Sequence, residues 1–165
     1  MTIKVEQSSP LTASHAECYA CGPNNKDGFG LVFRTSPSSA VEADFYCDLK
    51  YQGYPGFLQG GVVATLLDSA MTHCLFQRGV MAMTGRMHIQ FKKPVRIGEM
   101  VQIKADLLEQ RGPLFRLWAE VAQGGSLCAK ASATFMQIPK KLVPIGPSSQ
   151  TEPRDRSLNE KRDIE

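Results

Sequence analysis

The sequence predicts an α+β domain in which a strongly curved antiparallel sheet wraps around one long central helix. Apolar residues recur at three- and four-residue spacing over residues 62–75, which is typical of a helix with one buried face. Elsewhere, about six stretches alternate apolar and polar residues, as half-buried strands do. Short turns join the last four stretches, and they favour antiparallel neighbours because a parallel crossover needs roughly a dozen residues.

The domain is expected to open with a β-hairpin and to continue into the helix. Within residues 31–49 the segments LVFRT and VEADFYCDL both alternate, and the residues PSS stand between them. A loop rich in glycine and proline, residues 53–56, leads to the helix. The helix ends at Gly79. Its predicted buried face comprises Val63, Leu66, Leu67, Ala70, Met71 and Cys74.

Four strands are expected after the helix. In the first, Met87, Ile89 and Phe91 alternate with polar residues before Pro94 closes the strand. The remaining three strands are predicted at residues 100–109, 114–121 and 127–138. The turns between the strands hold the sequences IG, RGP and GG, which favour tight reversals of the chain.

The composition indicates one soluble globular domain. The 165 residues are 42% hydrophobic and 21% charged, which suits a single packed core and excludes disorder for the bulk of the chain. A net charge of +3 is too weak to indicate nucleic-acid binding, although it suits a small anionic ligand. Neither a signal peptide nor a membrane span is recognisable, so we expect a cytoplasmic protein with no membrane partner. In a reducing compartment the five cysteines are expected to be free thiols.

The two ends of the chain differ from this domain in composition. Residues 1–17 are read as an irregular lead-in, and residues 18–139 as the folded domain. Residues 140–165 contain three prolines and a dense mixture of both charges. Such a segment buries too little apolar surface to offset the entropy lost on ordering, so a flexible charged tail is expected.

Two glycines at the helix start, Gly60 and Gly61, suggest a site for a developing negative charge. Glycine costs up to about 1 kcal/mol in a helix. The first N–H groups of a helix lack internal partners, and the peptide dipoles make that end positive. Without side chains in the way, these N–H groups can stabilise a carbonyl oxygen that gains charge. The alternative is that the glycines only permit a tight turn or close packing.

Asp68 is a second candidate for chemistry. At 3.6 residues per turn it projects to the boundary between the buried face and the polar side of the helix. A partly desolvated carboxylate can act as a general base toward water, or as a nucleophile toward an activated carbonyl. The alternative is a solvated aspartate bonded to a neighbouring loop. Its occurrence together with the glycine pair favours the functional interpretation.

Four segments, taken in order, resemble a known family. These are CYACGPN, residues 28–33, YQGYPGFLQGGVVATLLDSAM and MHIQFKKPVRIGE. They resemble the hotdog-fold thioesterases of the PaaI-like branch of the 4-hydroxybenzoyl-CoA thioesterase superfamily, over residues 18–138. The resemblance implies hydrolysis of an acyl-CoA thioester without a cofactor. It also implies a homodimer, or a dimer of dimers, with the active site at the subunit interface.

The resemblance assigns roles to particular residues. Gly61 and Gly60 match the amides that polarise the thioester carbonyl, and Asp68 of the other subunit matches the acid that serves as base or nucleophile. Thr84 matches a residue that helps to hold water, although strand propensity explains it equally well. Gln59 stands where many relatives carry histidine. It can donate a hydrogen bond and orient substrate, but it cannot exchange protons.

The replacement of histidine by Gln59, and of an asparagine found in some relatives by Gly53, keeps other functions open. One is a non-catalytic protein that binds acyl-CoA on the same fold. Another is hydration or dehydration of an enoyl thioester, which is less well supported because such sites commonly use a histidine that this chain does not place there. Basic residues expected to contact the phosphates of CoA are Arg86, Lys92, Lys93 and Arg96.

The N-terminal side of the domain contains possible metal ligands. His15, Cys18 and Cys21 have ligand-like spacing, and Cys47 is a candidate fourth donor for tetrahedral zinc. Because a second CxxC pair is missing and the resemblance treats the CxxCG stretch as a lead-in to the first strand, no metal is assigned.

Other aromatic residues are expected to be structural. His73 and His88 have no acidic neighbour at motif spacing and are interpreted as ordinary surface or interface residues. Phe115 and Trp118 are expected to fill a packed or interface face of the sheet.

Overall fold

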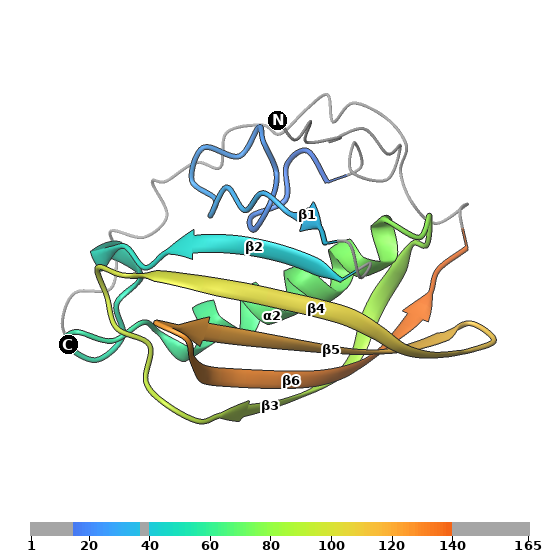
Figure 1. Ribbon diagram of the computed structural model, residues 1–165. Coiled ribbons are helices and arrows are strands. Elements are labelled where there is room, and N and C mark those ends of the chain that lie inside the picture. Colours follow the sequence, from blue (N-terminus) through green and yellow to red (C-terminus); the bar gives the residue numbers. More distant parts are fainter. Residues whose placement is uncertain (1–14, 37–39, 140–165) are drawn as a thin grey trace, which may run out of the picture.

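A six-stranded antiparallel sheet curves around one long helix in the computed structural model, which describes residues 15–36 and 40–139 (Figure 1). The sheet order is β1-β2-β4-β5-β6-β3, and all neighbouring strands are antiparallel. The elements are β1 (Arg34–Thr35), β2 (Val41–Tyr46), the short 3-10 helix η1 (Leu49–Tyr51), α2 (Gly60–Phe76), β3 (Ala82–Phe91), β4 (Met100–Arg111), β5 (Leu114–Gln123) and β6 (Ser126–Gln137). The predicted α+β architecture is confirmed.

Helix α2 lies inside the curve of the sheet and contacts the five long strands. The six residues of its predicted apolar face are all buried, so helical periodicity identified the face correctly. After the helix, Val80 N–H donates to the Leu75 carbonyl and Gly79 N–H to the Phe76 carbonyl. This bond pair, with Gly79 at φ +69°, is a Schellman motif, and glycine is suited to it because it adopts positive φ without a steric cost.

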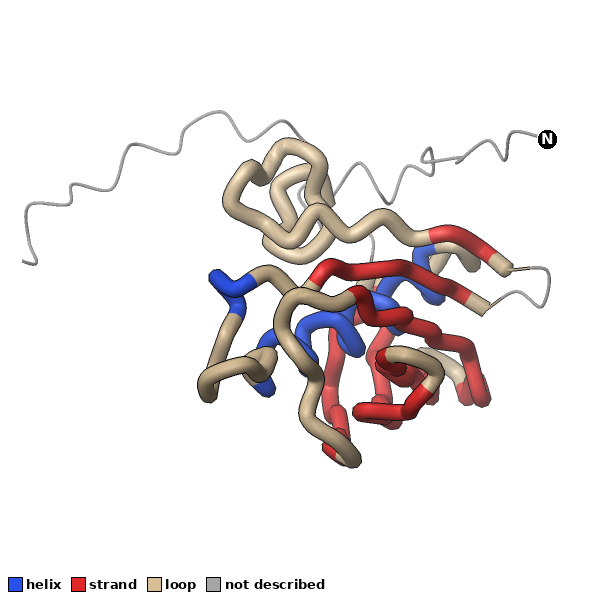
Figure 2. Tube along the Cα trace, turned by 60° about the vertical axis from the view of Figure 1, so that its left-hand side comes forward, coloured by secondary structure: helices blue, strands red, loops and turns tan. Residues whose placement is uncertain are grey.

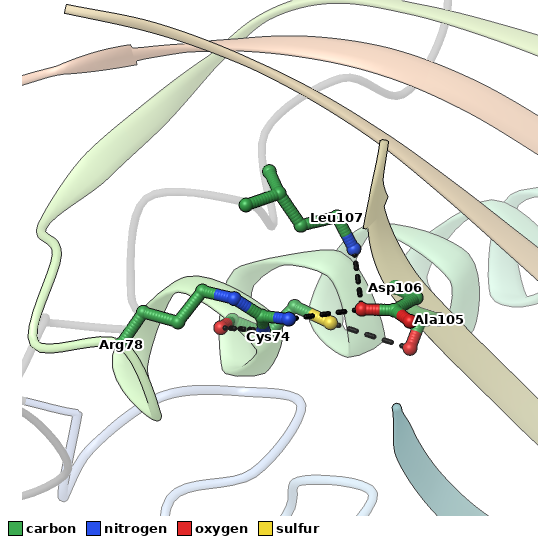
Figure 3. Close-up of polar contacts among 5 residues, drawn as sticks. All are labelled: Cys74, Arg78, Ala105, Asp106 and Leu107. Carbon is green, nitrogen blue, oxygen red and sulfur yellow. Dashed lines mark hydrogen bonds and ion pairs between the residues drawn. The ribbon is translucent and has the colours of Figure 1, made fainter. Parts of the chain in front are cut away.

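The C-terminal end of α2 is also anchored to β4 (Figure 3). The guanidinium group of Arg78 donates to the carbonyl of Cys74 at 2.9 Å and pairs with Asp106 Oδ1 at 2.9 Å. The same carboxylate oxygen accepts a hydrogen bond from the N–H of Leu107 at 2.7 Å. One side chain therefore satisfies a carbonyl of the last helical turn and links it to the sheet.

The alternation within the strands explains the core. In β5, Phe115, Leu117, Ala119 and Val121 face inward and are buried, as the period of two requires. Phe115 thus fills the core as expected. Trp118, three positions later, lies on the opposite face of the sheet and is only partly buried there, so the two residues do not share one face.

One expectation about strand order is wrong as well. The strand that follows the helix, β3, was predicted to neighbour β4, but it pairs with β6 at the edge of the sheet. The connecting residues 92–99 are not a tight turn. Lys92 N–H and Lys93 N–H both donate to the Cys128 carbonyl, and Leu58 N–H donates to the Val95 carbonyl. The segment therefore crosses the end of the sheet, close to the start of α2, before β4 begins.

The loop before β1 coils back on itself beside β2 (Figure 2). Leu31 N–H donates to the Ala20 carbonyl, and the ring of Phe29 packs against those of Phe45 and Tyr51 at centroid distances of 5.4 and 5.0 Å. Most of the predicted lead-in and the whole of the predicted tail lie outside the described residues. Within the described part of the chain, no helix has the length and apolar character needed to cross a membrane.

Candidate active site

The start of α2 presents two backbone amides that donate to no other group in the described part of the chain. Gln59 is the N-cap: its side-chain Oε1 accepts from Val62 N–H at 3.0 Å, and its carbonyl accepts from Val62 and Val63. The cap satisfies these two donors. The amides of Gly60 and Gly61, which precede them, remain available to a ligand at the positive end of the helix.

The two glycines differ in how much space surrounds them. A Cβ on Gly61 would lie 2.7 Å from Gln59 Oε1, whereas a Cβ on Gly60 would make an ordinary contact with the ring of Phe91 at 3.7 Å. Glycine at position 61 therefore allows the side chain of Gln59 to fold back over the first turn. With Oε1 engaged in the cap, the Nε2 group of Gln59 is the part of this side chain that can donate to a substrate.

An open pocket of about 290 Å³ lies beside this helix start. Its polar wall includes Lys92 and Lys93, two of the four basic residues predicted for phosphate contacts. Arg86 and Arg96 do not line it, and Arg96 instead approaches Glu99, with 3.9 Å between nitrogen and oxygen. The complete lining is Leu58, Gly60, Val63, Phe91, Lys92, Lys93, Pro94, Val95 and Ala129. The pocket is thus lined by Gly60, which carries one of the two free amides, by an apolar wall and by two cationic side chains.

Asp68 and Thr84, predicted separately, are in direct contact. The Thr84 hydroxyl on β3 donates to Asp68 Oδ1 on α2 at 2.6 Å. The register of β3 against β6 shifts between Thr84 and Arg86, with Gly85 at the irregularity. Asp68 is half-buried, as expected from its place at the boundary of the apolar face. Its second oxygen, Oδ2, accepts no hydrogen bond from the described residues.

Asp68 is remote from the free amides of its own chain. It follows Gly61 by seven helical residues, which corresponds to about 10 Å along the helix axis. A carbonyl bound at the Gly61 amide would sit about 3 Å from that nitrogen. Within one chain, Asp68 and the Gly61 amide are therefore separated along the helix by more than the length of a hydrogen bond.

His73, interpreted from the sequence as an ordinary surface or interface residue, is half-buried in the structure. Its ring stacks on Phe33 of the N-terminal loop at a centroid distance of 4.2 Å, and its buried Nε2 has no hydrogen-bond partner among the described residues. Burial lowers the pKa of His73 to about 4, and the nearby His15 adds to the decrease. No local pattern indicates this contact, because Phe33 comes from a loop distant along the chain. His88 is exposed on β3, as expected.

The residues weighed as metal ligands lie at the other end of α2. His15, Cys18 and Cys21 are clustered and half-buried, and Cys47 is not part of the cluster. Burial raises the pKa of the Cys21 thiol to about 12, with a contribution from Cys18, and burial lowers the pKa of His15. All five cysteines are free in the structure.

Comparison with known proteins gives consistent similarities. The family model described as "Thioesterase superfamily" matches residues 55–130, which include the helix start, the pocket lining and Asp68. Acyl-coenzyme A thioesterase THEM4 of Mus musculus is 32% identical over 118 residues, covering 68% of this chain and 51% of that protein. The chain spans about half the length of the THEM4 relatives that it matches.

Solved structures resemble this fold. The crystal structure of protein RHA08564, a thioesterase superfamily protein, has a TM-score of 0.70 and 22% identity, covering 73% of this chain and 60% of that one. The structure of smu.793 from Streptococcus mutans UA159 bound to acetyl CoA has a TM-score of 0.62 and 20% identity, covering 66% of this chain and 88% of that one. These likenesses show that the sheet and the helix have the arrangement found in thioesterase structures.

Proposed function

The chain belongs to the thioesterase superfamily and has its hotdog fold, and from this premise we propose that it hydrolyses an acyl-CoA thioester to a free acid and CoA. The observation that carries the proposal is the pair of free amides at Gly60 and Gly61 beside a pocket lined by Lys92 and Lys93. Similarity to proteins named acyl-coenzyme A thioesterases supports the same substrate class. Residues 18–139 form the domain proposed to act, as a cytoplasmic dimer or dimer of dimers.

The thioester carbonyl binds with its oxygen at the Gly61 amide. Attack on this carbonyl moves negative charge onto the oxygen, and a preorganised amide at the positive end of a helix stabilises that charge. Gln59 Nε2 is placed to donate a further hydrogen bond, because its Oε1 is held by Val62 N–H. The apolar ring of Phe91, exposed beside Gly60, forms one wall of the pocket.

Asp68 of a second copy of the chain activates the attack. The Thr84 hydroxyl occupies Oδ1 and leaves Oδ2 to accept a proton from water, or to attack the carbonyl directly. In the first route, water adds to the carbonyl carbon and its proton passes to Asp68. The tetrahedral intermediate then collapses, the C–S bond breaks, and CoA leaves as the thiolate. In the second route, an acyl-aspartate anhydride forms as the thiolate leaves, and water then hydrolyses it.

The lysines bind the other end of the substrate. Their backbone amides are fixed by the shared bonds to the Cys128 carbonyl, so the side chains of Lys92 and Lys93 start from a defined segment at the pocket. An ammonium group attracts phosphate as a point charge. We therefore assign the phosphates of CoA to this side of the pocket, with Arg86 and Arg96 farther from it.

CoA release from short-chain, medium-chain and aromatic acyl-CoAs tests the activity. Asp68→Asn should lower kcat at least about 100-fold, since it removes the base or nucleophile while keeping the shape of the side chain. Asp27→Asn is the matched control, because Asp27 is an exposed aspartate in the N-terminal loop, and it should leave kcat unchanged. Full activity in Asp68→Asn would remove Asp68 from this role.

Mixing two inactive variants tests the two-chain site. If Asp68→Asn and an inactive Gly61 variant are refolded or exchanged together, each mixed dimer contains one intact site, made of Gly61 from one chain and Asp68 from the other. Random pairing should restore about a quarter of the wild-type rate. A mixture that stays inactive, while size measurements show mixed dimers, contradicts the shared site.

Gln59 favours one alternative, a protein that binds acyl-CoA and does not hydrolyse it. The side chain at the helix start serves as a cap and cannot exchange a proton. Calorimetric binding of a non-hydrolysable acyl-CoA analogue, with no CoA release from any acyl-CoA in the unmutated protein, would establish this alternative.

A further inference from the structure

The N-terminal loop gathers three side chains that bind soft and borderline metal ions. Three ligand atoms lie within 4.8 Å of one another, one each from His15, Cys18 and Cys21. Cys21 Sγ is 3.9 Å from His15 Nδ1. In tetrahedral zinc sites the metal lies about 2.3 Å from sulfur and 2.0 Å from nitrogen, so neighbouring donor atoms are about 3.5 to 3.8 Å apart. The distances between the donor atoms need to shorten by about 1.3 Å at most to enclose such an ion.

The backbone of the loop holds this arrangement, together with the hydrogen bond between Cys21 Sγ and His15 Nδ1. Cys18 N–H donates to the His15 carbonyl at 3.0 Å, and Gly22 N–H donates to the Cys18 carbonyl at 2.8 Å. A Cβ on Gly22 would lie 2.4 Å from the Cys18 nitrogen and 2.5 Å from the Ala16 carbonyl oxygen. Only glycine at this position lets the chain turn tightly enough to bring Cys21 back beside Cys18 and His15.

The ring of His15 is positioned by the end of α2. It packs edge-on against Phe76 at a centroid distance of 4.6 Å, while its Nδ1 lies 3.9 Å from Cys21 Sγ. Because Phe76 lies 16 residues after Gly60, the cluster is about 24 Å along the helix from the free amides. It is therefore distant from the free amides, and Asp68 lies about 12 Å from Phe76 along the same helix.

We propose that His15, Cys18 and Cys21 bind Zn²⁺, with the fourth position of a tetrahedral ion filled by water or a small solute. Two thiolates and one imidazole suit zinc, whereas carboxylate and carbonyl oxygens are the ligands of magnesium and calcium. The ion links the N-terminal loop to the C-terminal end of α2 through His15 and stabilises this loop. A Cys18–Cys21 disulfide is the competing use of the same thiols, and it would leave His15 without a role.

The full chain, purified under reducing conditions, is tested first with Zn²⁺ and then with Co²⁺ as a spectroscopic probe. We expect one zinc per chain after buffer exchange. Replacement by Co²⁺ should give thiolate-to-cobalt charge-transfer absorption together with the visible bands of a tetrahedral ion. Zn²⁺ should also raise the unfolding temperature, because an ion that binds the folded chain stabilises it.

Variants assign the ligands. Cys18→Ser, Cys21→Ser and His15→Phe should each weaken Zn²⁺ binding at least about 10-fold, since even partners that only orient a ligand contribute this much. His15→Phe keeps an aromatic ring against Phe76 and so separates metal binding from packing. Cys128→Ser is the control, because Cys128 is a buried cysteine of β6 outside the cluster, and it should bind Zn²⁺ like the wild type.

Three results would overturn the proposal. One is a metal content that stays far below one ion per chain when the thiols are fully reduced. Another is equal Zn²⁺ affinity in Cys18→Ser and the wild type. The third is a cobalt spectrum without thiolate charge transfer. If a cysteine variant does not fold, the wild-type cobalt spectrum and the His15→Phe affinity still decide the question, and none of these measurements depends on acyl-CoA hydrolysis.

Discussion

Replacing Gly61 with alanine is expected to abolish most activity while leaving stability almost unchanged. The new Cβ would lie 2.7 Å from Gln59 Oε1, a distance that real contacts do not tolerate, so the side chain of Gln59 must leave its bond to Val62 N–H. Loss of an N-cap bond costs about 0.5 to 2 kcal/mol. Replacing glycine by alanine within a helix raises the free energy of unfolding by up to about 1 kcal/mol. The two effects oppose each other, and the net change should be within about 1 kcal/mol.

The catalytic effect of the same substitution is not offset. The methyl group narrows the approach to the Gly61 amide and displaces the second donor, Gln59 Nε2. Removing one donor of an oxyanion site in a known enzyme lowers kcat by about 100- to 1000-fold. A loss of this size, measured as CoA release, should therefore accompany a small change in the free energy of unfolding measured in urea.

A double-mutant cycle separates the two opposing effects on stability. In the Gln59→Ala background the cap is already lost, so Gly61→Ala should stabilise the protein by up to about 1 kcal/mol. Gly60→Ala is the matched control, because its Cβ meets the Phe91 ring at an ordinary 3.7 Å and leaves the cap intact. If Gly61→Ala destabilises the two backgrounds equally, displacement of Gln59 is not the cause. If Gly61→Ala keeps the wild-type kcat, the amide is not part of the site.

Three further predictions concern other contacts. Thr84→Val should lower kcat about 10-fold with little change in KM, because it removes the hydroxyl that orients Asp68, and Thr84→Ser should restore the rate; unchanged kcat in Thr84→Val would contradict this role. Arg78→Ala should lower the free energy of unfolding in urea by about 1 to 3 kcal/mol, since it removes the bond to the helix end and the ion pair with half-buried Asp106. Arg111→Ala, which breaks an exposed ion pair, is the control and should lower it by less than about 1 kcal/mol. Equal losses in the two variants would exclude an anchoring role for Arg78. Burial lowers the pKa of His73 to about 4 in the folded state, against 6.5 in the unfolded chain. Above pH 6.5 the side chain is neutral in both states, and its contribution to the free energy of unfolding is complete. As the pH falls from 6.5 toward 4, only the unfolded chain takes up the proton, and this stability is lost. The free energy of unfolding should drop by up to about 3 kcal/mol over this window, and a His73→Leu variant that keeps the whole drop would refute the assignment.

Local patterns in the sequence predicted the elements well, and for a physical reason. The apolar face of α2 and the alternation in β5 each follow from the geometry of one segment, so a reader of the sequence needs no other information to find them. The position of β3 depends instead on where residues 92–99 run. The bonds from Lys92 and Lys93 to the Cys128 carbonyl are long-range contacts, and no local pattern encodes them.

The candidate site shows the same division. Gly60, Gly61 and Asp68 were recognisable because each is unusual for its place in a helix. The bond between Thr84 and Asp68 depends on the irregularity of β3 at Gly85. The cap formed by Gln59 depends on the rotamer of its side chain. Neither is visible in residue spacing. Likewise, the spacing of His15, Cys18 and Cys21 suggested a donor set, but only the folded loop excludes Cys47 from it.

The two ends of α2 have different roles: the C-terminal end is anchored, and this anchoring allows the N-terminal end to stay open to a substrate. An amide that stabilises a developing charge must be fixed before the reaction, because a donor that has to move into place loses much of its effect. The start of α2 cannot be fixed by packing over its glycines, since that would close the approach to them. The helix is instead held by its buried face and by its far end, where the Gly79 motif, the Arg78–Asp106 pair and the His15–Phe76 contact all act. Rigidity at that end leaves the Gly60–Gly61 end open to a substrate.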